Sequence, residues 1–251
     1  MQKFDNPFLE VRKERLFTAD QTPSSRYAVF LTDDEADGAE YEVGTVSENY
    51  NLVPNEEVHQ TALDVLNRSE LEYEASTSRF DGKKYTQRWL MPTLQVEPRK
   101  DDIVQISLDL VNSYDGSTTF GLMFNAQRLA CVNGMMVDHQ LGGYKFRHIN
   151  QDNYQEQLQQ AADRIIALNN ALPGFTNKIQ AMIETPVDRE FTQNMFKHLK
   201  FGPSLIGQIY QAIEEDNVWG LYNACTQALT EKDSFRGDAI NRQVGKFLIA
   251  A

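Results

Sequence analysis

Cysteine, long apolar runs and recognisable catalytic motifs are all scarce in this chain of 251 residues. Only Cys131 and Cys225 are present, which excludes a disulfide framework and a four-cysteine zinc site. No apolar run approaches the roughly 20 residues of a membrane span. The first ten residues also lack the apolar stretch of a signal peptide. We therefore expect a cytoplasmic protein that does not enter membranes.

Positive charge is in the minority. The chain has 24 Lys and Arg residues against 36 Asp and Glu residues, a formal net charge of −12. A uniformly acidic surface would repel nucleic acid. Net charge is an average, however, and the distribution of the charges along the chain decides which partners can bind.

Chemistry-bearing motifs are missing from the sequence. Neither cysteine lies in a C-x-x-C motif, no pair of histidines has metal-ligand spacing, and neither G-x-S-x-G nor a P-loop occurs. We therefore predict a protein that is not an enzyme and that holds no cofactor and no metal. An enzyme remains the third-ranked alternative, with a site assembled from Asp138, His139, Arg147 and His148.

Residues 1–40 are predicted to form an irregular arm, with one short strand over 27–31. An acidic run follows over 33–42, and such a run usually marks a solvated loop. The alternative is an acidic arm that mimics the phosphates of DNA or blocks a basic groove. Residues 41–251 are predicted to form a single α+β domain.

The sheet-rich part of this domain is predicted over 41–150. A strand ending near Asn51 precedes a helix, for which Asn55 is the expected cap. Two antiparallel hairpins follow, with tight turns at Asp81-Gly82 and Asp115-Gly116. Pro92 is expected to limit the ladder of the first hairpin.

Hydrophobic periodicity predicts helices after the hairpins. The dense apolar run over 126–137 fits a buried helix or a strand, and a helix is slightly favoured. Residues 151–251 are predicted to be helical, with breaks near Pro173-Gly174 and Pro186. The expected fold class is α+β, with antiparallel hairpins packed with helices in the N-terminal half and a helical C-terminal half.

The first hairpin concentrates positive charge. Residues 79 to 100 include six basic and two acidic residues, so the net charge of this stretch is 6 − 2, or +4, within an acidic chain. Aromatic residues interleave with these cations, as in proteins that hold single strands by phosphate contacts and base stacking. The alternative is that the rings belong to the core and the lysines to a solvated sheet edge. The predicted nucleic-acid-binding residues are Arg79, Lys83, Lys84, Tyr85, Arg88 and Trp89, with Arg128, Lys145 and Arg147 on a second wall.

Two segments resemble an uncharacterised family. The turn at 112–117 with the downstream stretch 128–134, and the later stretch 219–226, resemble motifs of the phage/plasmid-like proteins of unknown function. That family includes uncharacterised proteins of enterobacterial prophages, and the resemblance covers about residues 40–240. It implies a mobile-element setting. Its order of hairpins followed by a helix is similar to that of single-strand annealing proteins, which assemble from many copies.

The leading hypothesis is therefore a phage or prophage protein that binds single-stranded DNA, with strand annealing and DNA recombination as the candidate activity. Its expected partners are single-stranded DNA and further copies of the chain. The alternative is a protein-binding module with an acidic interaction surface, either a phage structural component or an inhibitor of a host defence system. The alternative partner would be another phage protein or a host protein.

Overall fold

The structure is a computed structural model that describes residues 4–33, 36–118, 120–128, 133–135, 143–145, 154–230 and 235–249. The chain divides into two compact units, which are described separately below. The first unit comprises Met1–Trp89, Leu108–Met123 and Gly143–Ile166, and the second comprises Leu90–Ser107, Phe124–Gly142 and Ala167–Ala251.

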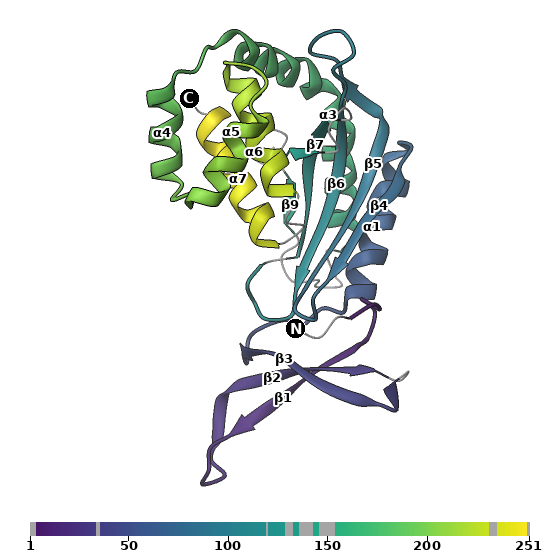
Figure 1. The fold of residues 1–251 in the computed structure, drawn as a ribbon. Helices are drawn as coiled ribbons and strands as arrows, with labels where there is room; N and C mark the ends of the chain where they lie inside the picture. The colour runs from purple at the N-terminus through teal and green to yellow at the C-terminus, as the bar shows by residue number, and fades with distance from the viewer. Residues whose placement is uncertain are drawn as a thin grey trace. The chain divides into compact units, whose positions relative to one another are not determined.

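The first unit begins with a three-stranded antiparallel sheet. Its strands are β1 (Glu10–Phe17), β2 (Pro23–Asp33) and β3 (Ala39–Ser47), in the order β1-β2-β3 (Figure 1). The expectation of an irregular arm is therefore wrong for the described part of residues 1–40. The short strand expected over 27–31 is confirmed as the middle of β2.

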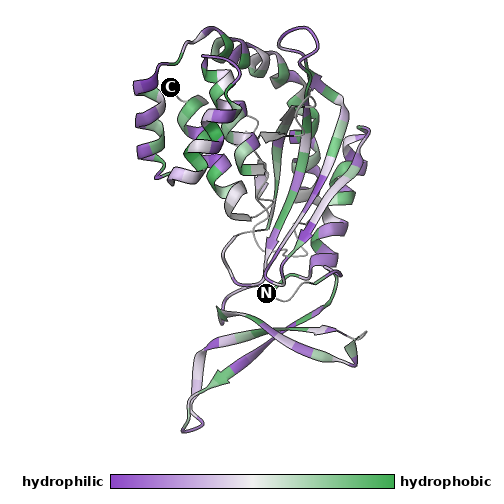
Figure 2. Cartoon of the chain, viewed as in Figure 1, coloured by the Kyte–Doolittle hydropathy of each residue, from purple (hydrophilic) through white to green (hydrophobic). Residues whose placement is uncertain are grey.

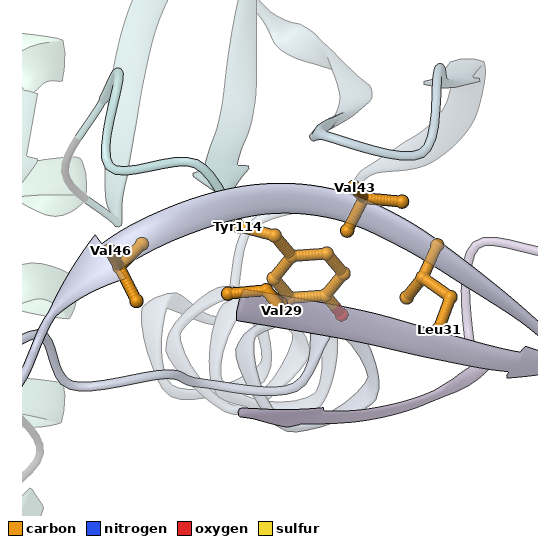
Figure 3. Close-up of a cluster of buried hydrophobic side chains, with 5 residues drawn as sticks. All are labelled: Val29, Leu31, Val43, Val46 and Tyr114. Atoms are coloured by element: carbon orange, nitrogen blue, oxygen red, sulfur yellow. The ribbon is translucent and has the colours of Figure 1, made fainter. Parts of the chain in front are cut away.

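One face of this small sheet builds a hydrophobic core. Val29, Leu31, Val43 and Val46 pack around the ring of Tyr114, as Figure 3 shows. All five side chains are buried, and Tyr114 comes from the turn region of the second hairpin. The N-terminal sheet is thus attached to the first unit by burial of apolar surface, the dominant favourable term in folding.

Tyr114 also connects this core to the first helix. Its hydroxyl accepts a hydrogen bond of 2.8 Å from the backbone N–H of Asn55, and its own N–H donates to the carbonyl of Lys83 over 2.7 Å. At Gly44 an added Cβ would lie 3.1 Å from the Cα of Asp115. A larger residue at position 44 would therefore push β3 away from the second hairpin turn.

Helix α1 (Asn55–Ser69) follows, close to the predicted bounds. Its apolar residues Val58, Ala62, Val65 and Leu66 recur at helical spacing and have no exposed surface. The expected cap is wrong, because Pro54 occupies the cap position. The buried side chain of Asn55 instead donates to the carbonyl of Pro7 and accepts from the amide of Asn112.

A six-stranded sheet follows α1 along the chain. Its strands are β4 (Glu74–Phe80), β5 (Lys84–Val96), β6 (Val104–Ser113), β7 (Gly121–Arg128), β8 (Asn133–Met135) and β9 (Gly143–Lys145). The order is β4-β5-β6-β7-β8, and β9 also pairs with β7. Every residue of β6 is buried, and β6 lies between β5 and β7 in the sheet.

Both predicted hairpin turns are confirmed. Gly82 and Gly116 have φ angles of 88° and 73°, which favour glycine because other residues are strained there. The side-chain carboxylate of Asp81 accepts hydrogen bonds from the backbone N–H groups of Lys83 and Lys84 at 2.9 and 2.8 Å. These bonds fix the tip of the first hairpin.

The ladder of the first hairpin ends before Pro92 although strand β5 does not, and the helix favoured over 126–137 is wrong. Strand β5 continues through Pro92 to Val96. Strand β4 has only seven residues, so it reaches no further than the first half of β5, and the missing N–H of Pro92 costs no bond on that side. The described parts of residues 126–137 are strands β7 and β8 and not a helix.

The C-terminal half is helical, as predicted. The helices are α3 (Tyr154–Glu184), α4 (Arg189–His198), α5 (Pro203–Ala212), α6 (Val218–Thr230) and α7 (Phe235–Ile249). These helices carry both hydrophilic and hydrophobic residues, which is typical of amphipathic helices (Figure 2). Within the second unit, α6 packs against α5, α7 and β8.

The expected helix break at Pro173-Gly174 is wrong. Helix α3 runs through Pro173 for 31 residues. Its buried residues keep helical spacing on both sides of the proline, with Ile165 and Leu168 before it and Phe175 and Ile179 after it. Continuous burial of this face outweighs the local cost of proline.

The fold class is α+β, as the sequence predicts. In the described part of the chain, every helix falls short of the length or apolarity needed to span a membrane. The domain bounds expected from the sequence stay a prediction.

Candidate functional site

The first hairpin packs α1 against one of its two sides. His59 of α1 lies with its Nδ1 2.8 Å from the hydroxyl of Tyr85, and its ring centroid is 5.4 Å from that of Trp89. Tyr85 and Trp89 are each only 1% exposed. Because a base can stack only on an accessible ring, the prediction that Tyr85 and Trp89 stack on DNA bases is wrong for this structure.

A short hydrogen-bonded chain runs from the exposed Ser78 to the α1 side of the hairpin. The side chain of Ser78 bonds to Tyr85, whose hydroxyl lies next to His59. Burial raises the pKa of Tyr85 to about 12 and lowers the pKa of His59. The two groups are therefore neutral near pH 7, where a protonated tyrosine hydroxyl can donate to an unprotonated histidine nitrogen.

The opposite side of the same hairpin carries the positive charge. Side chains alternate along a strand, so residues adjacent to Ser78 and Tyr85 point away from α1. Burial along β5 follows this alternation, with Lys84, Thr86 and Arg88 half-buried and the residues between them buried. Arg79 of β4 follows Ser78 and lies on the same side. We call Arg79, Lys84 and Arg88 the basic face.

An ion pair fixes one member of the basic face. Arg88 donates from Nε and Nη2 to the two carboxylate oxygens of Asp109 on β6, at 2.7 and 2.6 Å. The two side chains are 16% and 9% exposed. Such a bidentate pair holds the guanidinium in one orientation and compensates its charge. The carboxylate of Asp109 therefore sets the position of the Arg88 guanidinium on the basic face.

Sequence reasoning missed Asp109, although a signal was present. Asp109 interrupts the otherwise uncharged strand β6, between Leu108 and Leu110. A carboxylate is rarely buried in a strand without a partner of opposite charge. That rule alone would have predicted a cation on the neighbouring strand.

The remaining predicted cations fall into three groups. Lys83 is exposed in the hairpin turn, next to the end of the basic face. Of Arg128 and Lys145 only the backbone is described, on β7 and β9. Arg147 lies outside the described residues. The structure therefore brings Arg79, Lys84 and Arg88 together with Lys83 nearby, and the second wall stays a prediction.

Another cation of the predicted basic stretch is used in the second unit. Arg99 donates to Asp102 at 3.2 Å and to both carboxylate oxygens of Glu215. The same Oδ2 atom of Asp102 accepts a 3.2 Å hydrogen bond from the indole of the buried Trp219. Hydrogen bonding to Glu215 raises the pKa of Arg99. This network anchors the connection between β5 and β6 to the start of α6 and is structural.

Comparison with known families assigns most of the chain. Residues 42–246 match the family described as Domain of unknown function (DUF932). The chain belongs to this family. No curated protein and no solved structure gives a significant match. The expected membership of an uncharacterised family is confirmed, whereas the prophage setting and the likeness to annealing proteins stay predictions.

The basic face lies wholly within the DUF932 region. Strands β1 and β2 precede residue 42 and lie outside it. The candidate site is therefore built by the part of the chain that defines the family.

Proposed function

We propose that this DUF932 protein binds single-stranded DNA through the basic face, by contacts with phosphates. The observation that carries the proposal is the gathering of Arg79, Lys84 and Arg88 on one side of a hairpin in a chain of net charge −12. Cations placed on one surface create a local field that attracts a polyanion even when the whole protein is acidic.

The geometry favours contacts with the DNA backbone over contacts with bases. Lys84 and Arg88 lie four residues apart on β5, about 13 Å along an extended strand. The hydroxyl of Thr86 lies between them and can donate to a phosphate oxygen. Tyr85 and Trp89 point to the α1 side, so stacking is not part of the proposed mode. Binding of this kind is independent of sequence and depends strongly on salt.

Binding of DNA through its phosphate backbone is also compatible with strand annealing. A strand held by its phosphates keeps the hydrogen-bonding edges of its bases available for a complementary strand. Annealing needs no nucleophile, metal or cofactor, so a site of cations and hydroxyls is sufficient. We extend the proposal to a non-enzymatic annealing role in a phage or prophage, which rests on the sequence resemblance.

The test is a fluorescence-anisotropy titration with a labelled oligonucleotide at several salt concentrations. The double variant Lys83→Ala/Lys84→Ala removes two cations whose loss leaves the hydrophobic core intact. If both contact phosphates, the slope of log affinity against log salt falls by about 1.4, from 0.7 per contact for a single strand. The matched control, called the Lys197 control below, is Lys178→Ala/Lys197→Ala, which removes two exposed lysines of the second unit, one on α3 and one on α4.

The outcomes separate the possibilities clearly. Weaker binding and a lower salt slope in the double variant alone support the basic face. Equal loss in the Lys197 control indicates an effect of overall charge. Absence of binding by the wild-type protein at micromolar concentration and low salt contradicts the proposal. A duplex of the same sequence, bound as tightly as the single strand, contradicts its preference for single strands.

The second candidate function is binding to another protein. Leu16 and Phe17, adjacent at the end of β1, are 37% and 57% exposed. Large apolar side chains exposed together are typical of interaction sites. The variant Phe17→Ser tests this candidate: it is expected to leave DNA binding unchanged and to abolish capture of the protein partner, and capture at the wild-type level contradicts the candidate. The acidic run is a weaker candidate for this protein-binding site, because its Glu40 forms an ion pair with Arg12 at 3.0 Å.

A further inference from the structure

Strand β4 forms an edge of the six-stranded sheet. It pairs with β5 on one side, and within the described part of the chain no strand covers its other side. The five residues from Glu74 to Ser78 are exposed. An edge strand presents a row of backbone N–H and C=O groups that can pair with another strand.

This edge lacks the features that usually prevent such pairing. Its middle is Ala75-Ser76-Thr77-Ser78, without charge, proline or glycine. Proteins normally protect an exposed edge with lysine, proline or a bulge. Strand β1 of the same chain shows that protection, because five of its eight residues are charged and its register shifts at a bulge near its end. The contrast indicates that β4 is left able to pair.

We infer that β4 pairs antiparallel with β4 of a second copy of this chain and forms a two-fold symmetric dimer with one continuous sheet. The occupant must offer an extended edge with small side chains on both faces, and β4 itself offers one. A closed two-fold pair requires an axis perpendicular to the sheet, so one residue lies opposite its own copy. The candidates for this position are Ser76 and Thr77, in the middle of the strand.

Charge is compatible with this pairing. With Ser76 opposite its own copy, Glu74 faces Ser78 of the second copy. The two Glu74 carboxylates are then four residues apart along the strands, about 13 Å. This separation exceeds the Debye length of about 8 Å at physiological salt, so their repulsion is weak. Neither register sets two like charges opposite each other.

The two-fold axis has a consequence for the basic face. An axis perpendicular to the sheet keeps α1 of both copies on one side and the basic face of both copies on the other. The two sets of Arg79, Lys84 and Arg88 then share one sheet surface. The importance of this surface for DNA rests on the proposed function, whereas the dimer itself does not.

The experiment measures mass and cross-linking of the full-length protein. Size-exclusion chromatography with light scattering is expected to give twice the 28.7 kDa chain mass at high micromolar concentration. The variants Ser76→Cys and Thr77→Cys are oxidised with copper phenanthroline. Residues directly opposite each other in an antiparallel pair have Cα atoms about 4.5–5.5 Å apart, within disulfide range. One of the two is therefore expected to form a covalent dimer.

Controls separate this edge from other surfaces. Glu14→Cys places an exposed cysteine on β1 and is expected to form no covalent dimer after oxidation, like the wild-type chain. The variant Ser76→Lys/Thr77→Lys places one charge on each face of β4 and is expected to weaken the dimer at least tenfold while the circular dichroism spectrum of the folded chain stays that of wild type. A monomeric wild-type protein overturns the inference. So does a dimer that survives both lysines and forms no cross-link at either position. If the wild-type protein is a dimer but does not bind single-stranded DNA, the result contradicts only the proposed function.

Discussion

Replacing Trp89 with alanine distinguishes a core residue from a DNA-stacking residue. Trp89 is 1% exposed and lies against His59 of α1. Truncating a buried tryptophan removes its burial energy and leaves a cavity, at a cost of about 3–5 kcal/mol. For a chain of this length each kcal/mol lowers the melting temperature by about 2–4 °C, so a loss of about 4 kcal/mol predicts a fall of roughly 8–16 °C.

The assay is thermal unfolding followed by circular dichroism, with Thr86→Ala as the matched control. Thr86 lies on the same strand, three residues away, but on the half-buried side opposite α1. A substitution there is expected to change stability by no more than about 0.5 kcal/mol. If Trp89→Ala melts within a few degrees of wild type and loses DNA affinity instead, the reasoning is refuted and Trp89 is a stacking residue.

Three further perturbations test other contacts. Gly220→Ala is expected to destabilise the chain by about 3 kcal/mol in urea unfolding, since the new Cβ would lie 2.3 Å from the carbonyl oxygen of Glu215. Asp109→Ala leaves Arg88 half-buried without its carboxylate and should cost about 3 kcal/mol, whereas Arg88→Met/Asp109→Leu should recover most of this loss. Burial lowers the pKa of His59 in the folded state. The contribution of His59 to the free energy of unfolding is therefore full above the unfolded pKa of about 6.5 and is lost as the pH falls below it. The melting temperature of His59→Gln should therefore fall less than that of wild type between pH 7.5 and 5.

The elements that sequence reasoning predicted well are those with local signals. Asp81-Gly82 and Asp115-Gly116 predict their turns because glycine adopts a positive φ without strain. Helix α1 is predicted by the spacing of its apolar residues. Each of these signals lies within a few residues, and no distant contact is needed to interpret it.

The errors arise where distant contacts decide. Five of the eight residues of strand β1 are charged, four of them consecutive, so the strand has no apolar alternation that would predict it. It becomes a strand because β2 offers it a complete set of backbone partners. Pro92 is tolerated because the neighbouring strand β4 is too short to need its missing N–H. Pro173 is tolerated because the continuous buried face of α3 outweighs the free-energy cost of proline within a helix.

The sequence predicts which residues the candidate site contains but not which side of the hairpin each of them occupies. The concentration of cations on the first hairpin is visible in the sequence. Their division into two sides is not, because it depends on which side α1 covers. The alternation of β5 alone leaves two possibilities, with Tyr85 and Trp89 facing either α1 or the opposite side of the hairpin. The contact of His59 with both rings decides between them.

The position of Tyr114 has a practical consequence for truncation. The region shared with DUF932 begins at residue 42, in the middle of β3, yet the ring of Tyr114 packs against Val29 and Leu31 of β2. A fragment cut at the start of the shared region would lose one wall of a common core and would expose an aromatic cluster to water. Strands β1 and β2 therefore share a hydrophobic core with the family region, and a fragment that folds has to retain both.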